Sequence, residues 1–209
     1  MKSLFLVLSL LSFFLFLCVL ICAPYSGICE PINSNYVLLA AIGIHLGLLS
    51  IALYFLWSGS IKATFAKIGI SKDLKSHIFY SLVGLLSLFL LLLVLGFFSS
   101  LLGFNDQERV SEKVSDLPFM LLVFAIVLAP LSEEFFFRAF LVPRFGVLIS
   151  AFLFGIAHFT YGSIVEVLGA FVIGFLLGSI FKKSKSIVPC IIIHMTYNLI
   201  SIIAIKFLV

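Results

Sequence analysis

The chain has 209 residues, of which 63% are hydrophobic and only 11% are charged, and its mean hydropathy is +1.33. A soluble domain of this size cannot hide so much apolar surface in a core, so the composition indicates a membrane protein. The net charge of +4 comes with lysines clustered in two short loops, a pattern typical of membrane orientation that argues against a nucleic-acid-binding protein. No hydrophilic stretch approaches the ~50 residues of an independent domain. We therefore expect residues 1–209 to form a single membrane domain.

Apolar segments able to cross the ~30 Å hydrocarbon core of a bilayer recur along the whole chain. They cover residues 3–22, 36–57, 77–102, 118–142, 146–161, 163–181 and 187–209. The first resembles a secretory signal, but its apolar run of about 20 residues is longer than a normal signal core, so we expect it to remain as a helix. The alternation of apolar and polar residues that a membrane barrel needs is absent. The sequence predicts an all-α polytopic bundle of about seven transmembrane helices.

The charged loops predict how these helices are oriented. Lysines lie between the second and third segments (Lys62, Lys67, Lys72 and Lys75) and between the sixth and seventh (Lys182, Lys183 and Lys185). Basic loops tend to stay in the cytoplasm, whereas the acidic connection 103–117 is expected outside. With Lys2 inside, seven alternating spans satisfy every loop. The N-terminus is therefore predicted to be cytoplasmic.

Ionisable residues within the predicted spans gather in the second half of the chain. A charged side chain at the membrane centre costs about 2.5–3.5 kcal/mol on insertion scales, so each one needs a partner or a function. The fourth span contains Glu133, Glu134 and Arg138. Glu134 and Arg138 are spaced i,i+4 with the acid first, the favourable order for a helical ion pair. That pairing leaves Glu133, about 100° further around the helix, free to act as a base.

Two later spans add polar groups at a similar predicted depth. His158 lies in the fifth span, and His194 and Asn198 share one face of the seventh. Counted from the cytoplasmic ends at 1.5 Å per residue, these groups and the two glutamates lie about 11–18 Å deep. A shared layer is expected of residues that converge on one reaction centre. His45 in the second span has no polar companion at helical spacing, so we interpret it as a residue that packs or hydrogen-bonds to a neighbour's carbonyl.

The residue types in this layer suit peptide hydrolysis, which needs an activated water, donors for the oxyanion and a proton for the leaving amine. Glu133 and His158 are candidates to hold and deprotonate the water. His194 and Asn198 are candidates to bind the oxyanion. Glu133, His158 and His194 are also plausible zinc ligands, although the H-E-x-x-H helix of soluble zinc proteases is absent. A metal-free water and a zinc-bound water both remain open.

Three motifs on successive apolar segments carry a resemblance to a known family. They are E-E-x-x-x-R at residues 133–138, F-x-x-x-H at 154–158 and H-x-x-x-N at 194–198. Together they resemble the CPBP family of CAAX proteases and bacteriocin-processing enzymes, which includes the type II CAAX prenyl endopeptidases. The resemblance covers residues 118–200, the expected catalytic core. Residues 1–117 hold the N-terminal helices and no recognised motif.

The resemblance implies an intramembrane endopeptidase acting on a membrane-associated substrate, either lipidated or of bacteriocin type, in a prokaryotic cell membrane. It implies that Glu133 and His158 activate the water and that His194 and Asn198 form the oxyanion site. Members have been described both as metalloproteases and as glutamate-dependent proteases, so it implies either no cofactor or zinc. The expected partners are the lipid bilayer and a membrane-associated peptide or protein, and not nucleic acid.

Other interpretations of the polar layer stay open. Ser132 and Cys190 lie close enough in sequence to remain candidate nucleophiles. A membrane scaffold or bacteriocin-immunity protein would use the layer to fix helix packing, and Glu133→Ala would then destabilise the protein. If the protein is an enzyme, the Glu133→Gln variant should stay folded but be inactive. An ion-coupled transporter would use Glu and His as a relay. Transporters usually have repeated halves and broken helices, and the sequence has neither.

Overall fold

The computed structural model describes residues 1–9, 11–12, 34–70, 73–104 and 106–208, and every regular element in these ranges is helical. The α-helices are α2 (Ser34–Leu56), α3 (Ile61–Lys67), α4 (Leu74–Leu101), α5 (Glu108–Ser115), α6 (Phe119–Val123), α7 (Ala129–Glu133), α8 (Val142–Ala157), α9 (Ile164–Ser184) and α10 (Val188–Leu208). Shorter π- and 3₁₀-helical stretches are η1 (Phe124–Leu128), η2 (Glu134–Leu141) and η3 (His158–Tyr161). The all-α prediction is confirmed for the described residues.

Five helical segments within the described ranges are long and apolar enough to cross a membrane. They are Val37–Leu56, Leu74–Leu101, Phe119–Tyr161, Ile164–Ser184 and Val188–Phe207. Four of them coincide with predicted spans, and Phe119–Tyr161 joins the predicted fourth and fifth. The predicted first span, residues 3–22, lies mostly outside the described residues. The chain is an integral membrane protein with several spanning helices, while the count of seven is not confirmed.

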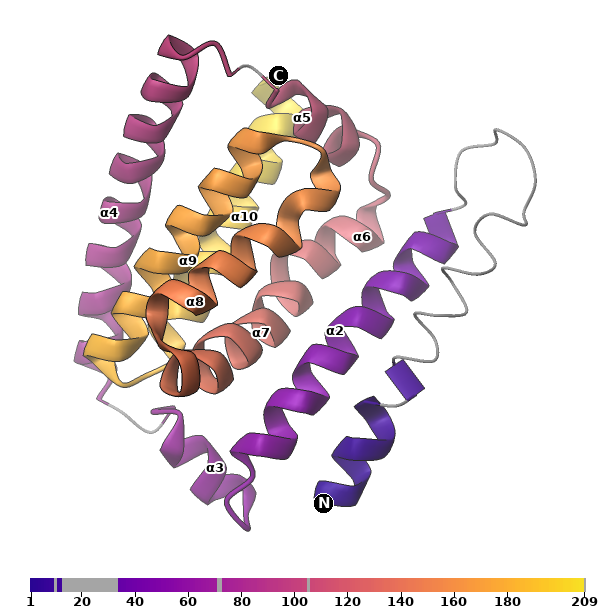
Figure 1. The fold of residues 1–209 in the computed structure, drawn as a ribbon, viewed down its shortest axis with the longest axis vertical. Coiled ribbons are helices and arrows are strands. Elements are labelled where there is room, and N and C mark those ends of the chain that lie inside the picture. Colours follow the sequence, from indigo (N-terminus) through magenta and orange to yellow (C-terminus); the bar gives the residue numbers. More distant parts are fainter. Residues whose placement is uncertain (10, 13–33, 71–72, 105, 209) are drawn as a thin grey trace.

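The long segment Phe119–Tyr161 folds back on itself. If its 43 residues formed a straight helix, it would be about 65 Å long, twice the hydrocarbon thickness. Gly146 reverses the chain at φ 84° and ψ 170°, a conformation that residues with a Cβ rarely adopt. Beyond it, the Ser150 hydroxyl donates to the Phe137 carbonyl at 2.7 Å, and α8 lies against the preceding arm (Figure 1). The two predicted spans are therefore the two arms of a helical hairpin.

The first arm of this hairpin contains two π-helical stretches, η1 and η2, in which a backbone N–H bonds to the carbonyl five residues earlier. A proline follows each stretch two residues later, Pro130 after η1 and Pro143 after η2. Proline lacks an N–H and its ring clashes with the carbonyl one turn earlier, so the helix widens ahead of it. Such wide turns are frequent at functional sites, and η2 begins at Glu134.

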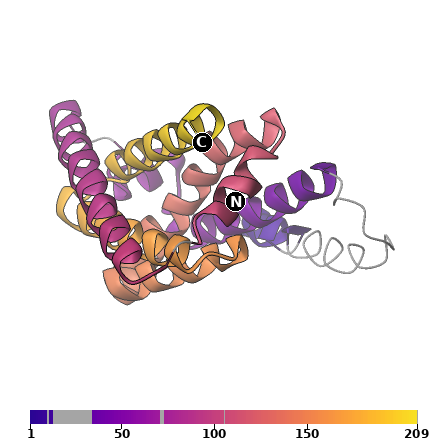
Figure 2. The same ribbon diagram turned by 90° about the horizontal axis from the view of Figure 1, so that it is seen from above.

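The segment 119–141 occupies the middle of the molecule. α2 packs on one side of it, and α8, α9 and α10 pack on its other sides. α4 and α2 lie on opposite sides of the bundle (Figures 1 and 2). On the outer edge, α4 exposes Leu86, Leu90 and Leu93, as expected for a helix in contact with lipid. The middle segment can therefore receive side chains from α2, α8 and α10 at one level.

The two lysine-rich loops lie at the same end of the bundle, as the predicted topology requires. The Ile187 N–H donates to the Ile68 carbonyl at 3.0 Å, and the Ser186 hydroxyl donates to the Gly69 carbonyl at 2.9 Å. A Cβ on Gly69 would lie 2.0 Å from the carbonyl oxygen of Lys185, so only glycine fits at this contact. These contacts involve no lysine side chain, and the lysines of the two loops that the structure describes are exposed.

The acidic connection lies at the opposite end. Asp106 accepts hydrogen bonds from the Ser163 hydroxyl and the Ile164 N–H at the start of α9. In α5, Arg109 donates to the Gly162 carbonyl at 2.8 Å and Lys113 donates to the Thr160 carbonyl at 2.8 Å. These contacts hold the turn between α8 and α9. Which end faces the cytoplasm stays a prediction.

Candidate active site

The second glutamate of the pair forms a fully buried chain of contacts with an arginine and a histidine. Glu134 and Arg138 are 0% and 1% exposed, with Arg138 Nε 3.0 Å from Glu134 Oε2. The N–H is not aligned for a hydrogen bond, so this contact is Coulombic. The other carboxylate oxygen, Oε1, lies 2.8 Å from Nδ1 of His194. Glu134 thus ties η2 to α10.

Arg138 is also held by aromatic rings. Its guanidinium lies 4.3 Å from the centre of the Phe154 ring, a favourable cation–π distance. The same Phe154 ring lies 4.7 Å from the ring of His158 and 5.8 Å from the ring of His194. Phe154, the first residue of the F-x-x-x-H motif, therefore packs at the centre of the polar layer.

Glu133 is the more accessible carboxylate, with 15% of its side chain exposed. Its Oε2 lies 3.8 Å from Nε2 of His194, and its Oε1 lies 3.9 Å from Nε2 of His45. Both separations are too long for a direct hydrogen bond. The structure thus gives the two glutamates the different environments that the i,i+4 spacing suggests: Glu134 is buried in the core, and Glu133 is partly exposed between two imidazoles.

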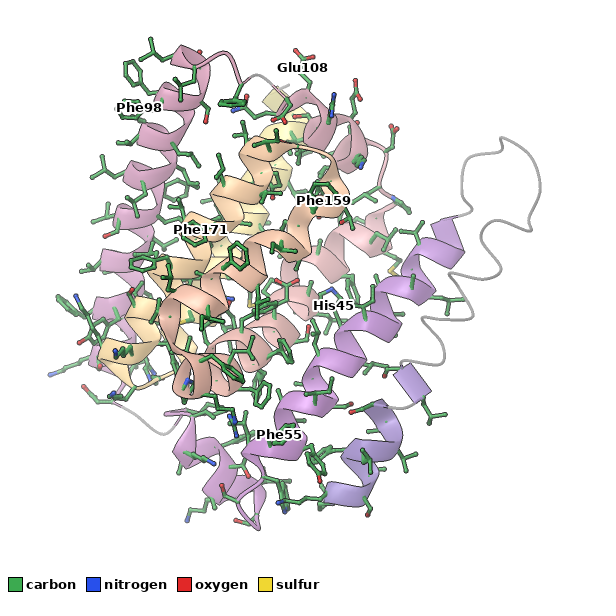
Figure 3. All side chains as sticks on the ribbon, in the orientation of Figure 1. His45, Phe55, Phe98, Glu108, Phe159 and Phe171 are labelled. Atoms are coloured by element: carbon green, nitrogen blue, oxygen red, sulfur yellow. The ribbon has the colours of Figure 1, made fainter. Side chains whose placement is uncertain are left out.

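His45 is the site residue that sequence reasoning missed, and its interpretation as a residue that packs or hydrogen-bonds to a carbonyl was incomplete. Nδ1 lies 2.6 Å from the hydroxyl oxygen of Ser132, and the ring meets Phe124 edge to face at 5.1 Å. Figure 3 shows His45 on the side of α2 that faces the middle segment. Because its polar companions come from a helix 87 positions away in sequence, no local spacing could have revealed them.

His158 lies at the end of α8, beside the layer. Its Nδ1 lies 2.8 Å from the Phe154 carbonyl, one helical turn earlier, so Nε2 is the nitrogen available for other partners. Among the described residues, the imidazoles within 4.0 Å of the Glu133 carboxylate are those of His45 and His194. The structure therefore brings His194 and His45 to Glu133 and leaves His158 further away.

Asn198 supplies a hydrogen-bond donor that Pro130 lacks in the middle segment. In η1 the Ala129 N–H bonds to the Phe124 carbonyl, five residues earlier. The corresponding donor for the next carbonyl, that of Ala125, would be residue 130, and proline has no N–H. The Asn198 side-chain amide donates to the Ala125 carbonyl at 2.9 Å. One of its two N–H groups is therefore used within the protein, and one is left for another acceptor.

A zinc site would need the same residues in a tighter arrangement. Zinc is usually bound by three or four ligand atoms about 2.0–2.3 Å from the ion. In the part of the chain that the structure describes, no group of three His, Cys, Asp or Glu side chains is arranged to hold a metal ion. The Nδ1 of His194 is engaged by Glu134, and His158 is not beside Glu133. The predicted set of Glu133, His158 and His194 does not fit a shared ion in this arrangement.

The comparison with protein families agrees with the motifs. Residues 115–200 match the family model described as type II CAAX prenyl endopeptidase Rce1-like. No curated protein and no solved structure matched the chain. The match confirms the resemblance predicted from the three motifs and supports a protease of the CAAX type in the membrane. It contains six predicted site residues, Glu133, Glu134, Arg138, His158, His194 and Asn198, and it leaves α2 and His45 outside.

Proposed function

We propose that the protein is an intramembrane endopeptidase that hydrolyses a peptide bond of a membrane-associated substrate by means of a water activated at Glu133. The observation that carries this proposal is the pair Glu133 and Glu134, one partly exposed and one fully buried. Burying an ion pair is costly unless its geometry is good, and a carboxylate with no direct partner is costlier still in a membrane. A structural network has no need of Glu133, whereas a hydrolase needs such a base.

In the proposed reaction, the water oxygen bonds to the scissile carbonyl carbon while one water proton moves to Glu133. The carbon–nitrogen bond then breaks, and Glu133 delivers that proton to the leaving nitrogen. The second water hydrogen stays in the new carboxyl group, so atoms and charge balance. The contacts of Glu134 with Arg138 and His194 keep the relative position of η2 and α10 fixed during these steps. This holds the base at a fixed distance from the substrate.

The oxyanion is proposed to bind near α10. Glu134 engages Nδ1 of His194, so Nε2 is the nitrogen proposed to face the substrate oxygen, to which it donates when it carries a hydrogen. The free N–H of Asn198 lies one turn further along the same face. His158 borders this space through Phe154 and is proposed to contact the substrate or the water once the substrate is bound, since catalytic hydrogen bonds are often long in unbound enzymes.

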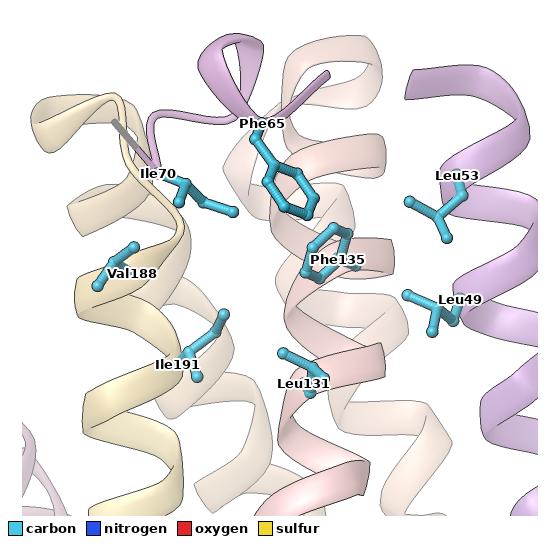
Figure 4. A pocket seen from close by; sticks show the side chains of 8 residues that line it. All are labelled: Leu49, Leu53, Phe65, Ile70, Leu131, Phe135, Val188 and Ile191. Atoms are coloured by element: carbon cyan, nitrogen blue, oxygen red, sulfur yellow. The ribbon is translucent and has the colours of Figure 1, made fainter. Parts of the chain in front are cut away.

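An apolar pocket next to the layer supports a membrane-associated substrate (Figure 4). Its volume is about 350 Å³, and its lining is entirely apolar: Leu49, Leu53, Phe65, Ile70, Leu131, Phe135, Val188 and Ile191. On α2, Leu49 is one turn from His45, and on α10, Ile191 is one turn from His194. The pocket therefore continues the site towards the lysine-rich end, and its small volume suits an apolar side chain or lipid chain.

Purified protein in detergent tests the proposal. Three peptides would be compared: a farnesylated C-terminal Cys-a-a-X peptide, the same peptide without the lipid, and an apolar leader-type peptide. We expect cleavage of at least one, with the apolar pocket favouring the lipidated form, and loss of turnover in Glu133→Gln with unchanged thermal stability. A Glu133→Gln protein that cleaves at the wild-type rate would overturn the proposal.

Chelator treatment separates the two versions of the mechanism. Activity that is indifferent to chelator supports a water held by side chains alone. Activity that is lost with chelator and restored by zinc would require the histidines to rearrange around Glu133. A scaffold or immunity protein instead predicts no cleavage by wild type, and a marked loss of thermal stability in Glu133→Ala.

A further inference from the structure

His45 belongs to α2, outside the segment that matches the family model, yet it is one of the two imidazoles beside Glu133. Two features need explanation. The ring is fixed by a short contact with Ser132, at 2.6 Å, and its other nitrogen stops 3.9 Å from Glu133. A residue that only packed α2 against the middle segment would need the contact with Ser132, but it would not need a ring nitrogen facing Glu133.

The partners of Ser132 favour the tautomer of His45 that carries its proton on Nδ1. The Ser132 hydroxyl oxygen lies 2.9 Å from the Ala129 carbonyl and 3.2 Å from the Leu128 carbonyl. Carbonyls only accept hydrogen bonds, so the single hydroxyl hydrogen has two backbone acceptors within reach. We assign the hydroxyl hydrogen to these carbonyls and the His45 proton to Nδ1, so that the hydroxyl oxygen accepts from His45. In the neutral ring, Nε2 is therefore an acceptor.

The gap between His45 and Glu133 is consequently lined by acceptors on both sides. Nε2 and the carboxylate oxygen cannot bond to each other without a donor, and a water molecule supplies two. Nε2 and the carboxylate oxygen are 3.9 Å apart. A water oxygen about 2.8 Å from each of them would see the two atoms at an angle of roughly 90°, close to the angle between the two hydrogen bonds that one water can donate. At 17% and 15% exposure, both side chains are partly accessible to a water-sized molecule.

We propose that His45 is a further catalytic residue, which binds the attacking water together with Glu133 from the side of α2. This inference rests on the proposed function. As the water oxygen bonds to the carbonyl carbon, one water hydrogen moves to Glu133 and the other stays on oxygen, hydrogen-bonded to Nε2 of His45. The N-terminal half of the chain therefore contributes to the reaction centre.

Substitutions at His45 separate this role from packing. His45→Asn keeps an amide N–H for Ser132 but has no group at the position of Nε2. His45→Gln can place an acceptor there, and His45→Phe keeps the edge contact with Phe124. With the farnesylated peptide, we expect kcat to fall about 10²-fold in the Asn and Phe variants, the size of effect that misplacement of a reactant produces. KM should change little, and Gln should retain more activity.

The control variant on the same helix is Leu46→Ala, because Leu46 is 48% exposed on the outer face of α2. It should keep wild-type kcat and thermal stability. Wild-type kcat in His45→Asn would overturn the inference, and so would equal losses in all three His45 variants with lowered thermal stability, since that pattern marks a packing role. Complete loss in Ser132→Ala, matching His45→Phe, would identify a serine nucleophile activated by His45 and would also overturn it.

An experimental structure that resolves waters tests the same point without a substrate. A water within about 3 Å of both Nε2 of His45 and Oε1 of Glu133 supports the inference. A direct bond between the two side chains, or a gap without water, contradicts it. Failure of wild-type protein to cleave any peptide would count against the proposed function, whereas cleavage by a protein that holds no water in this gap would count against the role of His45 alone.

Discussion

His194 lies 2.8 Å from Glu134 through Nδ1 and 3.8 Å from Glu133 through Nε2. One imidazole on α10 therefore contacts both carboxylates of the middle helix, with a buried partner on one nitrogen and an accessible carboxylate on the other. Arg138 and His194 both contact the Glu134 carboxylate. Arg138 therefore influences the position of His194 through Glu134. The site is thus fixed from its buried side.

Arg138→Leu should destabilise the protein as well as inactivate it. Removing the guanidinium leaves Glu134 buried without its cation, and breaking a buried ion pair typically costs about 3–5 kcal/mol. The measurement is the midpoint of thermal unfolding in detergent, together with peptide cleavage. Arg144→Leu is the control, since Arg144 is exposed and donates to a backbone carbonyl. Full stability without activity in Arg138→Leu would instead place the arginine on the substrate.

Asn198 and Pro130 should be energetically coupled. Asn198→Ala leaves the half-buried Ala125 carbonyl without its donor, which should cost about 1–3 kcal/mol of unfolding free energy. Pro130→Ala restores a backbone N–H at the position that can reach this carbonyl. The cost of Asn198→Ala should therefore be smaller in the Pro130→Ala background, and a double-mutant cycle on unfolding measures the difference. Strict additivity would contradict the role of Asn198 as a substitute donor.

Asp106, at the end of the bundle opposite the lysine-rich loops, should make stability depend on pH. Hydrogen bonds from the Ile164 N–H and the Ser163 hydroxyl lower the pKa of Asp106 below its ordinary value of 3.8. A lowered folded-state pKa stabilises the fold above the unfolded value, and this contribution is lost as pH falls through the lowered pKa. Asp106→Asn should therefore unfold at lower temperature than wild type at neutral pH, with the difference shrinking below pH 3.8. Asp116→Asn, at an exposed aspartate of the same connection, is the matched control.

The positions of the loops predict accessibility to membrane-impermeant reagents. Single cysteines at Lys67 and Lys183, in a background without the native cysteines, should be protected in intact cells, and a cysteine at Glu112 should react. This follows from the excess of lysine at one end. Opposite accessibility of Lys67 and Lys183 would contradict the structure, in which their loops touch. Reversal of all three would contradict the cytoplasmic prediction alone.

The sequence by itself was enough to predict the helical class, the approximate positions of the spans and the set of polar residues in the second half. Hydropathy and i,i+4 spacing are local properties, and a membrane penalises every unexplained charge, so Glu133, Glu134 and Arg138 stand out as a group in the sequence itself. The family match covers the same region. Within the pair, spacing alone also suggested which glutamate binds Arg138.

The tertiary structure decided the contacts that join distant helices. His45 meets Ser132 across 87 positions, and Asn198 meets Ala125 across 73. Neither contact follows a helical period, because each depends on how α2 and α10 pack against a middle helix widened ahead of Pro130. In the same packing, His158 lies at the side of the polar layer and His45 lies next to Glu133. A sequence encodes such neighbours only through the fold, since partners on different helices share no spacing.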